Sequence, residues 1–138
     1  MSWVVDTCLL IDVLEDDSAF GESSARLLDN AASDGLIVCP VSYAELAPAF
    51  AGDLQRQNEF LDAIGVAYAL AWTWTETQRA HRAWFNHVSL RRRGKSIKRP
   101  IADILIGAFA QSHQGLLTRN PDDFRDVFPK LAVRVPKS

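Results

Sequence analysis

The sequence predicts a single α/β domain over residues 1–138, with a short, mostly parallel β-sheet flanked by α-helices in an α/β/α arrangement. Short apolar runs alternate along the chain with longer segments of helical spacing, a pattern typical of parallel βαβ units. With 138 residues, 48% hydrophobic and 23% charged, the chain is large enough for one core and has ordinary globular composition. No repeat, low-complexity tract or linker divides it.

The first half of the chain should contain three buried strands and four helices. The strands are short apolar runs, expected at 3–5, 36–39 and 66–70. Helices are expected at 7–14, at about 18–33, from Ser42 onward and at about 54–64. Asp6 or Thr7 opens the first of these helices, and Gly35 and Gly65 stop the second and the fourth.

Two longer helices and two strands should follow in the second half. Thr73-Trp74-Thr75-Glu76 has the spacing of a capping box and predicts a helix that ends near Arg93-Gly94. Pro100 suits the first turn of the next helix, which should run to about His113. The remaining strands are expected at 116–118 and 131–135.

Three acids stand where an apolar run gives way to a helix or where a helix begins: Asp6, Glu45 and Asp103. In an open parallel sheet such positions gather outside the carboxyl ends of the strands, where ligands bind. Converging carboxylates repel one another unless a proton or a cation compensates, and a hard divalent cation such as Mg²⁺ or Mn²⁺ prefers their oxygens. The constellation therefore predicts metal-dependent phosphodiester chemistry.

Each acid also has a purely structural interpretation. Asp6 can be the N-cap of the first helix, and Glu45 can reach back to the backbone N–H of Ser42 in a capping box. Asp103 lies in a first helical turn, where the macrodipole stabilises an acid by about 0.3–1 kcal/mol. A cap needs no neighbouring acid, whereas a metal site needs several oxygens, so spatial convergence separates the two interpretations.

Four motifs, in order, resemble those of PIN-domain ribonucleases, most closely the VapC-type toxins of bacterial toxin–antitoxin pairs. The motifs are Val4-Val5-Asp6-Thr7, Ser42-x-x-Glu45-Leu46, Asp103-Ile104-Leu105-Ile106-Gly107-Ala108 and Leu117-Thr118-Arg119-Asn120-Pro121-Asp122-Asp123-Phe124. The resemblance covers essentially the whole chain. It implies a metal-bound acidic pocket, cleavage of RNA such as tRNA or rRNA, a cognate VapB-like antitoxin and a homodimer.

By motif position, the resemblance makes Asp6, Glu45 and Asp103 the central catalytic acids and the ligands of Mg²⁺ or Mn²⁺. The fourth catalytic position falls on Asn120, where many family members carry Asp. The neighbouring residues that could substitute for this acid or orient a water are Thr7, Thr118, Asp122 and Asp123. Local capping is the alternative role for these four side chains.

A basic stretch comes just before the third acid and could hold the RNA backbone beside an acidic pocket that otherwise repels it. The expected RNA-binding residues are Arg91, Arg92, Arg93, Lys95, Lys98 and Arg99, with Arg119 near the pocket. An ordinary solvated surface is the alternative.

The remaining features of the sequence exclude several other classes. The chain lacks a signal-peptide pattern and an apolar run long enough for a membrane, so a cytoplasmic protein is expected. Cys8 and Cys39 lack zinc-like spacing and are expected to be free thiols. A phosphotransferase that uses Asp6 as nucleophile would need an acid at position 8, where Cys8 stands. The non-enzymatic alternative is an inactive PIN-like module that binds RNA or protein, and only Asn120 favours it.

Overall fold

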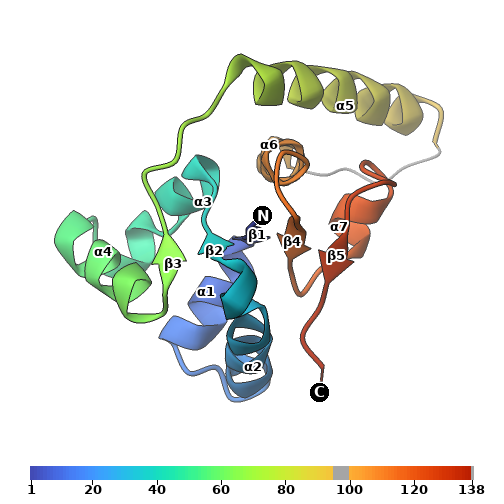
Figure 1. Ribbon diagram of the computed structural model, residues 1–138. Helices are drawn as coiled ribbons and strands as arrows, with labels where there is room; N and C mark the ends of the chain where they lie inside the picture. The colour runs from blue at the N-terminus through green and yellow to red at the C-terminus, as the bar shows by residue number, and fades with distance from the viewer. Residues whose placement is uncertain (95–99, 138) are drawn as a thin grey trace.

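The computed structural model describes residues 1–94 and 100–137 and confirms the predicted α/β class. Its five strands are all parallel and lie in the order β3-β2-β1-β4-β5 (Figure 1). They are β1 (Trp3–Val5), β2 (Leu36–Ile37), β3 (Val66–Ala67), β4 (Gly115–Leu117) and β5 (Val133–Arg134). The first strand is therefore central, with its carboxyl end flanked by those of β2 and β4.

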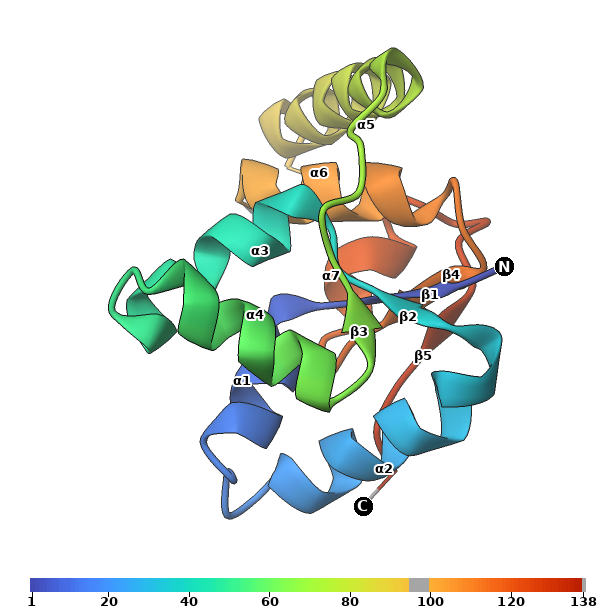
Figure 2. The same ribbon diagram turned by 60° about the vertical axis from the view of Figure 1, so that its left-hand side comes forward.

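Helices cover both faces of this sheet. The longer ones are α1 (Thr7–Leu14), α2 (Gly21–Ala31), α4 (Leu54–Ala63), α5 (Trp74–Arg92) and α6 (Ile101–Ala110). The shorter ones are α3 (Pro40–Glu45), α7 (Asp122–Arg125) and the 3₁₀ turns η1 (Ala32–Asp34) and η2 (Ala47–Phe50). Figures 1 and 2 show α1 and α2 on one face of the sheet and α6 on the other, with α5 outside α6.

Alternation along β1 divides the core between these two faces. Trp3 and Val5 pack into the cluster formed with α1, α2 and α4, whereas Val4 packs with Phe109 of α6 on the opposite face. All three are buried, as expected for a central strand of a parallel sheet that is covered on both sides. Because β1 is held on both faces, its carboxyl end is a rigid place for a functional side chain.

The third predicted helix departs from its expected start. The helix α3 begins at Pro40 and not at Ser42, with Cys39 as its N-cap. Proline suits the first helical position because its fixed φ favours the helix and its missing N–H needs no partner there. The predicted helix start at Ser42 is therefore wrong, and Ser42 lies inside the helix, where it cannot form the capping box that was the alternative interpretation of Glu45.

Most of the other differences are at the ends of elements. The capping box at Thr73 is present, with the Thr73 N–H donating to Glu76 Oε2 at 3.0 Å. Pro100 is the N-cap of α6 and not a first-turn residue. The helix α7 was not predicted. Among the described residues, no helix is long and apolar enough to cross a membrane.

Candidate active site at the carboxyl end of the first strand

Asp6 follows the last residue of β1 and is buried, with 7% of its surface exposed. Its backbone N–H donates to the Leu117 carbonyl at 2.9 Å, which continues the β1–β4 pairing by one residue. Its carboxylate Oδ1 accepts the Thr7 backbone N–H at 2.8 Å, so Asp6 is also the N-cap of α1. The capping interpretation of Asp6 is therefore confirmed, and it occupies only one of the two carboxylate oxygens.

The second oxygen of Asp6 faces the adjacent strand. The Thr118 hydroxyl, fully buried after β4, donates to Asp6 Oδ2 at 2.7 Å. The same hydroxyl oxygen accepts the backbone N–H of Asn120 at 3.0 Å, which fixes the turn that leads to the fourth motif position. Thr118 therefore links the carboxylate of the central strand to the backbone at Asn120.

Glu45 reaches this edge of the sheet from the end of α3. The Thr7 hydroxyl donates to Glu45 Oε1 at 2.8 Å, and Glu45 itself is exposed. A residue at the first turn of α1 thus joins an acid 38 positions later in the chain. This contact replaces the local cap that the sequence offered as an alternative for Glu45.

Burial and neighbouring charge both act on the acid of the central strand. Burial raises the pKa of Asp6 above its ordinary value of 3.8, and the charge of Glu45 raises the pKa further, while hydrogen bonds from Thr118, Thr7 and Cys8 oppose this rise. Burial raises the pKa of the Cys39 thiol to about 11, and the charges of Glu45 and Asp6 add to this rise. Asp6 is therefore poorly solvated, and the exposed Glu45 lies close enough for its charge to act on the Asp6 carboxylate.

Asp103 lies in the first turn of α6 and is half-buried. Figure 2 shows α6 running back over the sheet from the end where β1 stops, beside α3. The three motif acids thus come from three elements that meet at one edge of the sheet. Asn120 is exposed, and Asp122 and Asp123 open α7 as its first-turn acids.

This edge is not a preformed metal cage. Within residues 1–94 and 100–137, no group of three or more His, Cys, Asp or Glu side chains is arranged to hold a metal ion. Of the three acids, Asp6 and Glu45 are directly linked: Thr7 donates a hydrogen bond to each of them, and the charge of Glu45 raises the pKa of Asp6. Asp103 shares their edge.

Comparison with known proteins identifies the family of this chain. The family model described as PIN domain matches residues 3–128. The chain belongs to the PIN domain family. The match runs from the first residue of β1 past α7, so it includes every motif residue discussed above.

A solved structure supports the same fold for this PIN domain. The crystal structure of VapBC2 from Rickettsia felis, bound to a DNA fragment from their promoter, contains a chain that matches with a TM-score of 0.71 and 16% identity. The match covers 99% of this chain and 100% of that chain. A search of curated proteins finds no match. PIN domains are generally nucleases that use divalent metal ions, which agrees with acids gathered at the edge of the sheet.

Arg119, which the sequence predicted to contact RNA phosphate, is paired with a carboxylate of this PIN domain itself. Arg119 Nε and Nη2 donate to the Asp12 carboxylate at 3.0 and 3.1 Å, and the guanidinium lies 4.2 Å from the centroid of the Phe20 ring. Ser24 Oγ also donates to Asp12, at 3.0 Å. Arg119 therefore ties the turn after β4 to α1 and α2.

The sequence interpretation missed Asp12. This acid is buried on the inner side of α1, with 3% of its surface exposed. The sequence did carry a signal for it, because a buried carboxylate needs a partner and Asp12 stands within an apolar run, Leu9-Leu10-Ile11-Asp12-Val13-Leu14. The free thiols were predicted correctly: Cys39 is buried and Cys8 is half-buried.

The predicted basic stretch is described only in part. Arg91 and Arg92 form the last turn of α5, and Arg93 is its C-cap, all of them exposed. Lys95, Lys98 and Arg99 lie outside the described residues. Cationic side chains at a helix C-terminus also interact favourably with the helix dipole, so this position alone does not separate a local role from RNA binding.

Proposed function

We propose that this chain is a Mg²⁺- or Mn²⁺-dependent endoribonuclease that acts in the cytoplasm as the toxin of a VapBC-type toxin–antitoxin pair. The observation that carries the proposal is the desolvated carboxylate of Asp6 at the end of the central strand of a PIN domain. This carboxylate is held by Thr118 and has Glu45 as its acidic neighbour. A purely structural cap would need neither the burial nor the second acid.

The donor chemistry at this edge fits a hard divalent cation. Asp6, Glu45 and Asp103 offer carboxylate oxygens, and a cation would stabilise the ionised form of Asp6 that burial disfavours. Mg²⁺ commonly keeps several waters and takes only one or two carboxylates from a protein, so a preformed cage of three side chains is not required. Asp6 and Asp103 would hold the ion directly or through water.

The remaining groups have separable roles in the proposed cleavage. When bound, the ion supplies Lewis-acid polarisation of the phosphate oxygens and compensates the carboxylate charge. Glu45 is exposed and lies within hydrogen-bond reach of the Thr7 hydroxyl, so its carboxylate can accept the proton of an attacking water. Thr118 keeps the Asp6 carboxylate in a fixed orientation. The amide oxygen of Asn120 can orient a water but adds no negative charge.

The toxin assignment rests on the same fold and on the similarity to a chain of the VapBC2 structure. It implies a VapB-like antitoxin that masks the activity, and a homodimer. At 16% identity the similarity supports the fold, so the partner needs its own test: co-expression with the product of a small adjacent reading frame should suppress both RNA cleavage and growth arrest.

The test of the activity is to mix the purified, antitoxin-free protein with total bacterial RNA and Mn²⁺ or Mg²⁺ and to map new RNA ends. Discrete cuts that disappear in EDTA and in Asp6→Asn are expected. The matched control is Asp29→Asn, which removes one exposed acid from α2 and should leave cleavage intact.

A binding module without activity is the second candidate, favoured by Asn120 at the position where many relatives carry an acid. It predicts no cuts under any divalent ion while metal binding persists. Absence of both cuts and metal binding would leave the three acids as structural residues and contradict the proposed chemistry.

A further inference from the structure

We propose that the outer face of α5 is a docking surface for single-stranded RNA, on which bases stack against Trp74 and Phe85 and Arg82 contacts phosphate. The choice of RNA rests on the proposed function. The surface itself is inferred from exposure, charge and shape, and neither the acidic edge nor the predicted basic stretch before α6 includes these three residues.

The exposed side of α5 carries large aromatic side chains, which are usually found on the buried side of a helix. Trp74 and Phe85 are 72% and 66% exposed, although large aromatic side chains gain the most from burial. The buried residues of the helix are smaller or polar: Glu76, Ala80, Ala83 and His87. Since α5 packs on α6 through that inner side, its outer aromatic side chains need another explanation.

A shallow surface depression lies beside Trp74 in the first half of the helix. It has a volume of about 320 Å³ and is lined by Trp74, Thr77, Gln78, His81 and Arg82. Thr77 accepts the Trp72 indole N–H at 2.7 Å, which holds this part of the wall in place. An aromatic face, a guanidinium and a primary amide around one concavity are the groups that stack on a nucleobase and hydrogen-bond to its edge.

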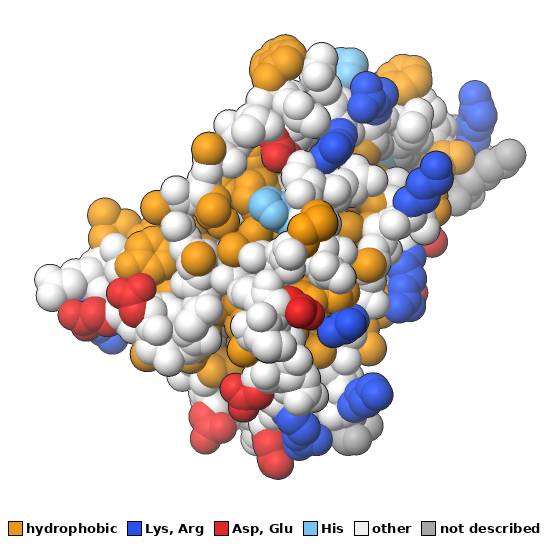
Figure 3. All heavy atoms as spheres, viewed as in Figure 1, with side chains coloured by type: hydrophobic (Ala, Val, Ile, Leu, Met, Phe, Trp, Pro, Cys, Tyr) orange, Lys and Arg blue, Asp and Glu red, His pale blue; other side chains and the backbone are white. Residues whose placement is uncertain are grey.

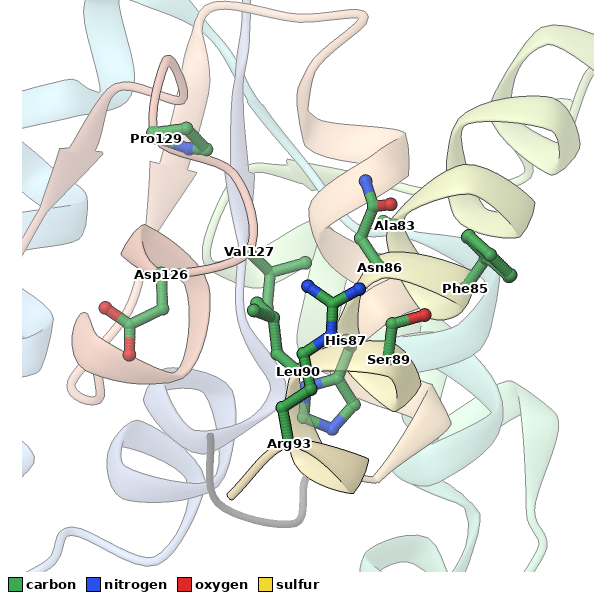
Figure 4. Close-up of a pocket in the computed structure, with 10 residues that line it drawn as sticks. All are labelled: Ala83, Phe85, Asn86, His87, Ser89, Leu90, Arg93, Asp126, Val127 and Pro129. Atoms are coloured by element: carbon green, nitrogen blue, oxygen red, sulfur yellow. The ribbon is translucent and has the colours of Figure 1, made fainter. Parts of the chain in front are cut away.

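The same side of the helix continues past a second concavity. Phe85, Ser89 and Arg93 help to line a hollow of about 490 Å³ between α5 and the segment after α7. Figure 4 shows Arg93 reaching back along the helix toward Asn86, with Asp126 on the opposite wall. With 19 residues the helix is about 28 Å long, enough for several nucleotides along one face.

Charge favours a polyanion as the occupant. Residues 1–72 contain 12 acidic and 2 basic residues, whereas residues 73–138 contain 5 acidic and 13 basic residues. On the side shown in Figure 3, Lys and Arg gather over α5 and along the right-hand edge, while Asp and Glu gather over α4 and around α1 and α2. Such asymmetry within one domain is typical of nucleic-acid binding, and the net charge of −2 conceals it.

A second copy of this chain fits the surface less well. A two-fold contact centred on this face of α5 would place Arg82 and Arg93 of one copy near the same two arginines of the other, and like charges across an interface are unfavourable. Single-stranded RNA instead offers phosphates to the arginines and unstacked bases to the aromatic rings. Both kinds of side chain on α5 are therefore used by one ligand.

The test is the affinity for a fluorescein-labelled single-stranded RNA of about 12 nucleotides, measured by anisotropy in EDTA so that no cleavage intervenes. The variants are Trp74→Ala, Trp74→Phe, Phe85→Ala and Arg82→Gln. Matched controls are Leu54→Ala and Arg56→Gln, which remove an exposed apolar and an exposed basic side chain from α4 in the acidic half. Sedimentation of the same samples reports self-association.

We expect Trp74→Ala and Phe85→Ala each to weaken binding about tenfold, and Trp74→Phe to restore most of the loss, because stacking needs only an aromatic face. Arg82→Gln should reduce the slope of log affinity against log salt by about 0.7, the value for one phosphate contact on a single strand. The α4 controls should bind as the wild type does.

Unchanged RNA affinity in the α5 variants would overturn the proposal. So would a loss of self-association without a loss of RNA binding, which would make α5 an interface between copies. The outcome is independent of the proposed catalysis: if RNA binding depends on α5 but Mn²⁺ yields no cuts, the docking surface stands and the nuclease proposal fails. If the α5 variants bind RNA with unchanged affinity and still cut it, the nuclease proposal stands and the docking surface is contradicted.

Discussion

In the metal-free protein, the hydrogen bonds of Asp6 favour its ionised form, whereas its burial and the charge of Glu45 disfavour it. Asp6 caps α1 and holds Thr118, yet its charge lies in a buried place beside Glu45. Because its pKa is raised above the ordinary 3.8, the native state holds the proton more tightly than the unfolded chain does. Stability contributed by this group is therefore present at pH values below about 3.8 and is lost as pH rises through the native pKa.

This sign predicts that Asp6→Asn is more stable than the wild type at pH 7 in EDTA, because the variant has no charge to bury. Its amide oxygen can still cap α1, and asparagine is as good an N-cap as aspartate. The free energy of unfolding from urea titrations should show a difference between the two proteins that shrinks as pH falls toward 4. A variant that is less stable at pH 7 would mean that the carboxylate is mainly a structural cap.

Asp12 is a second buried acid. Unlike Asp6, it has a cationic partner within the protein, the guanidinium of Arg119. The Asp12 side chain is 4% exposed and that of Arg119 is 31% exposed. Arg119→Gln should lower the free energy of unfolding by about 2–3 kcal/mol, because removal of one partner leaves a buried carboxylate without its cation.

The control for this prediction is Arg26→Gln, whose salt bridge with Glu22 is 3.1 Å long but well exposed on both sides. Exposed pairs contribute about 0.5 kcal/mol or less, so this variant should unfold almost as the wild type does. Equal effects of the two substitutions would show that the Asp12–Arg119 pair has no special stabilising role.

At the level of elements, the packing of α6 depends on a missing side chain. A Cβ atom placed on Gly107 would lie 2.2 Å from the Phe128 ring, so the helix can approach the segment after α7 only with glycine there. Gly107 and Ala110 are three positions apart in the sequence, so both small residues lie on one side of this helix. The Phe128 ring itself could not be predicted, because the residue is 21 positions away and follows a helix that has only four residues.

Gly107→Ala should therefore destabilise the protein by about 1–3 kcal/mol through overpacking, although alanine favours a helix interior by about 1 kcal/mol over glycine. Adding Phe128→Leu should restore part of the loss, since leucine leaves room for the new methyl group. Chemical denaturation of both variants checks this. A Gly107→Ala variant as stable as the wild type would show that the ring moves aside without cost.

Local chemistry determined which elements the sequence could predict. The helix α1 begins at Thr7 and ends at Leu14 as expected, because Asp6 caps it and its apolar spacing is regular. The predicted start of α3 at Ser42 was two residues late, because Pro40 directly follows an apolar run and yet serves as the first helical residue. The link between Thr7 and Glu45 spans 38 positions and could not be deduced from either motif alone.

At the scale of the whole molecule, acids gather at the carboxyl end of β1 and basic residues gather in the second half of the chain. A ligand that neutralises the acidic edge should therefore stabilise the native state of this PIN domain. Binding to the native state alone contributes about 2.7 kcal/mol when the free ion is at 100 times its dissociation constant. For a domain of this size, Mn²⁺ at that level should raise the Tm by about 5–10 °C.

The rise in Tm on adding Mn²⁺ should be absent in Asp6→Asn and reduced in Asp103→Asn and Glu45→Gln, because each variant removes one oxygen donor or one charge from the same edge. Asp29→Asn, on the outer side of α2, should respond as the wild type does. Thermal unfolding with and without Mn²⁺, at constant ionic strength, separates specific binding from general screening of the acidic half. The same rise in all five proteins would contradict a metal site at the end of β1, because screening acts on every exposed carboxylate alike.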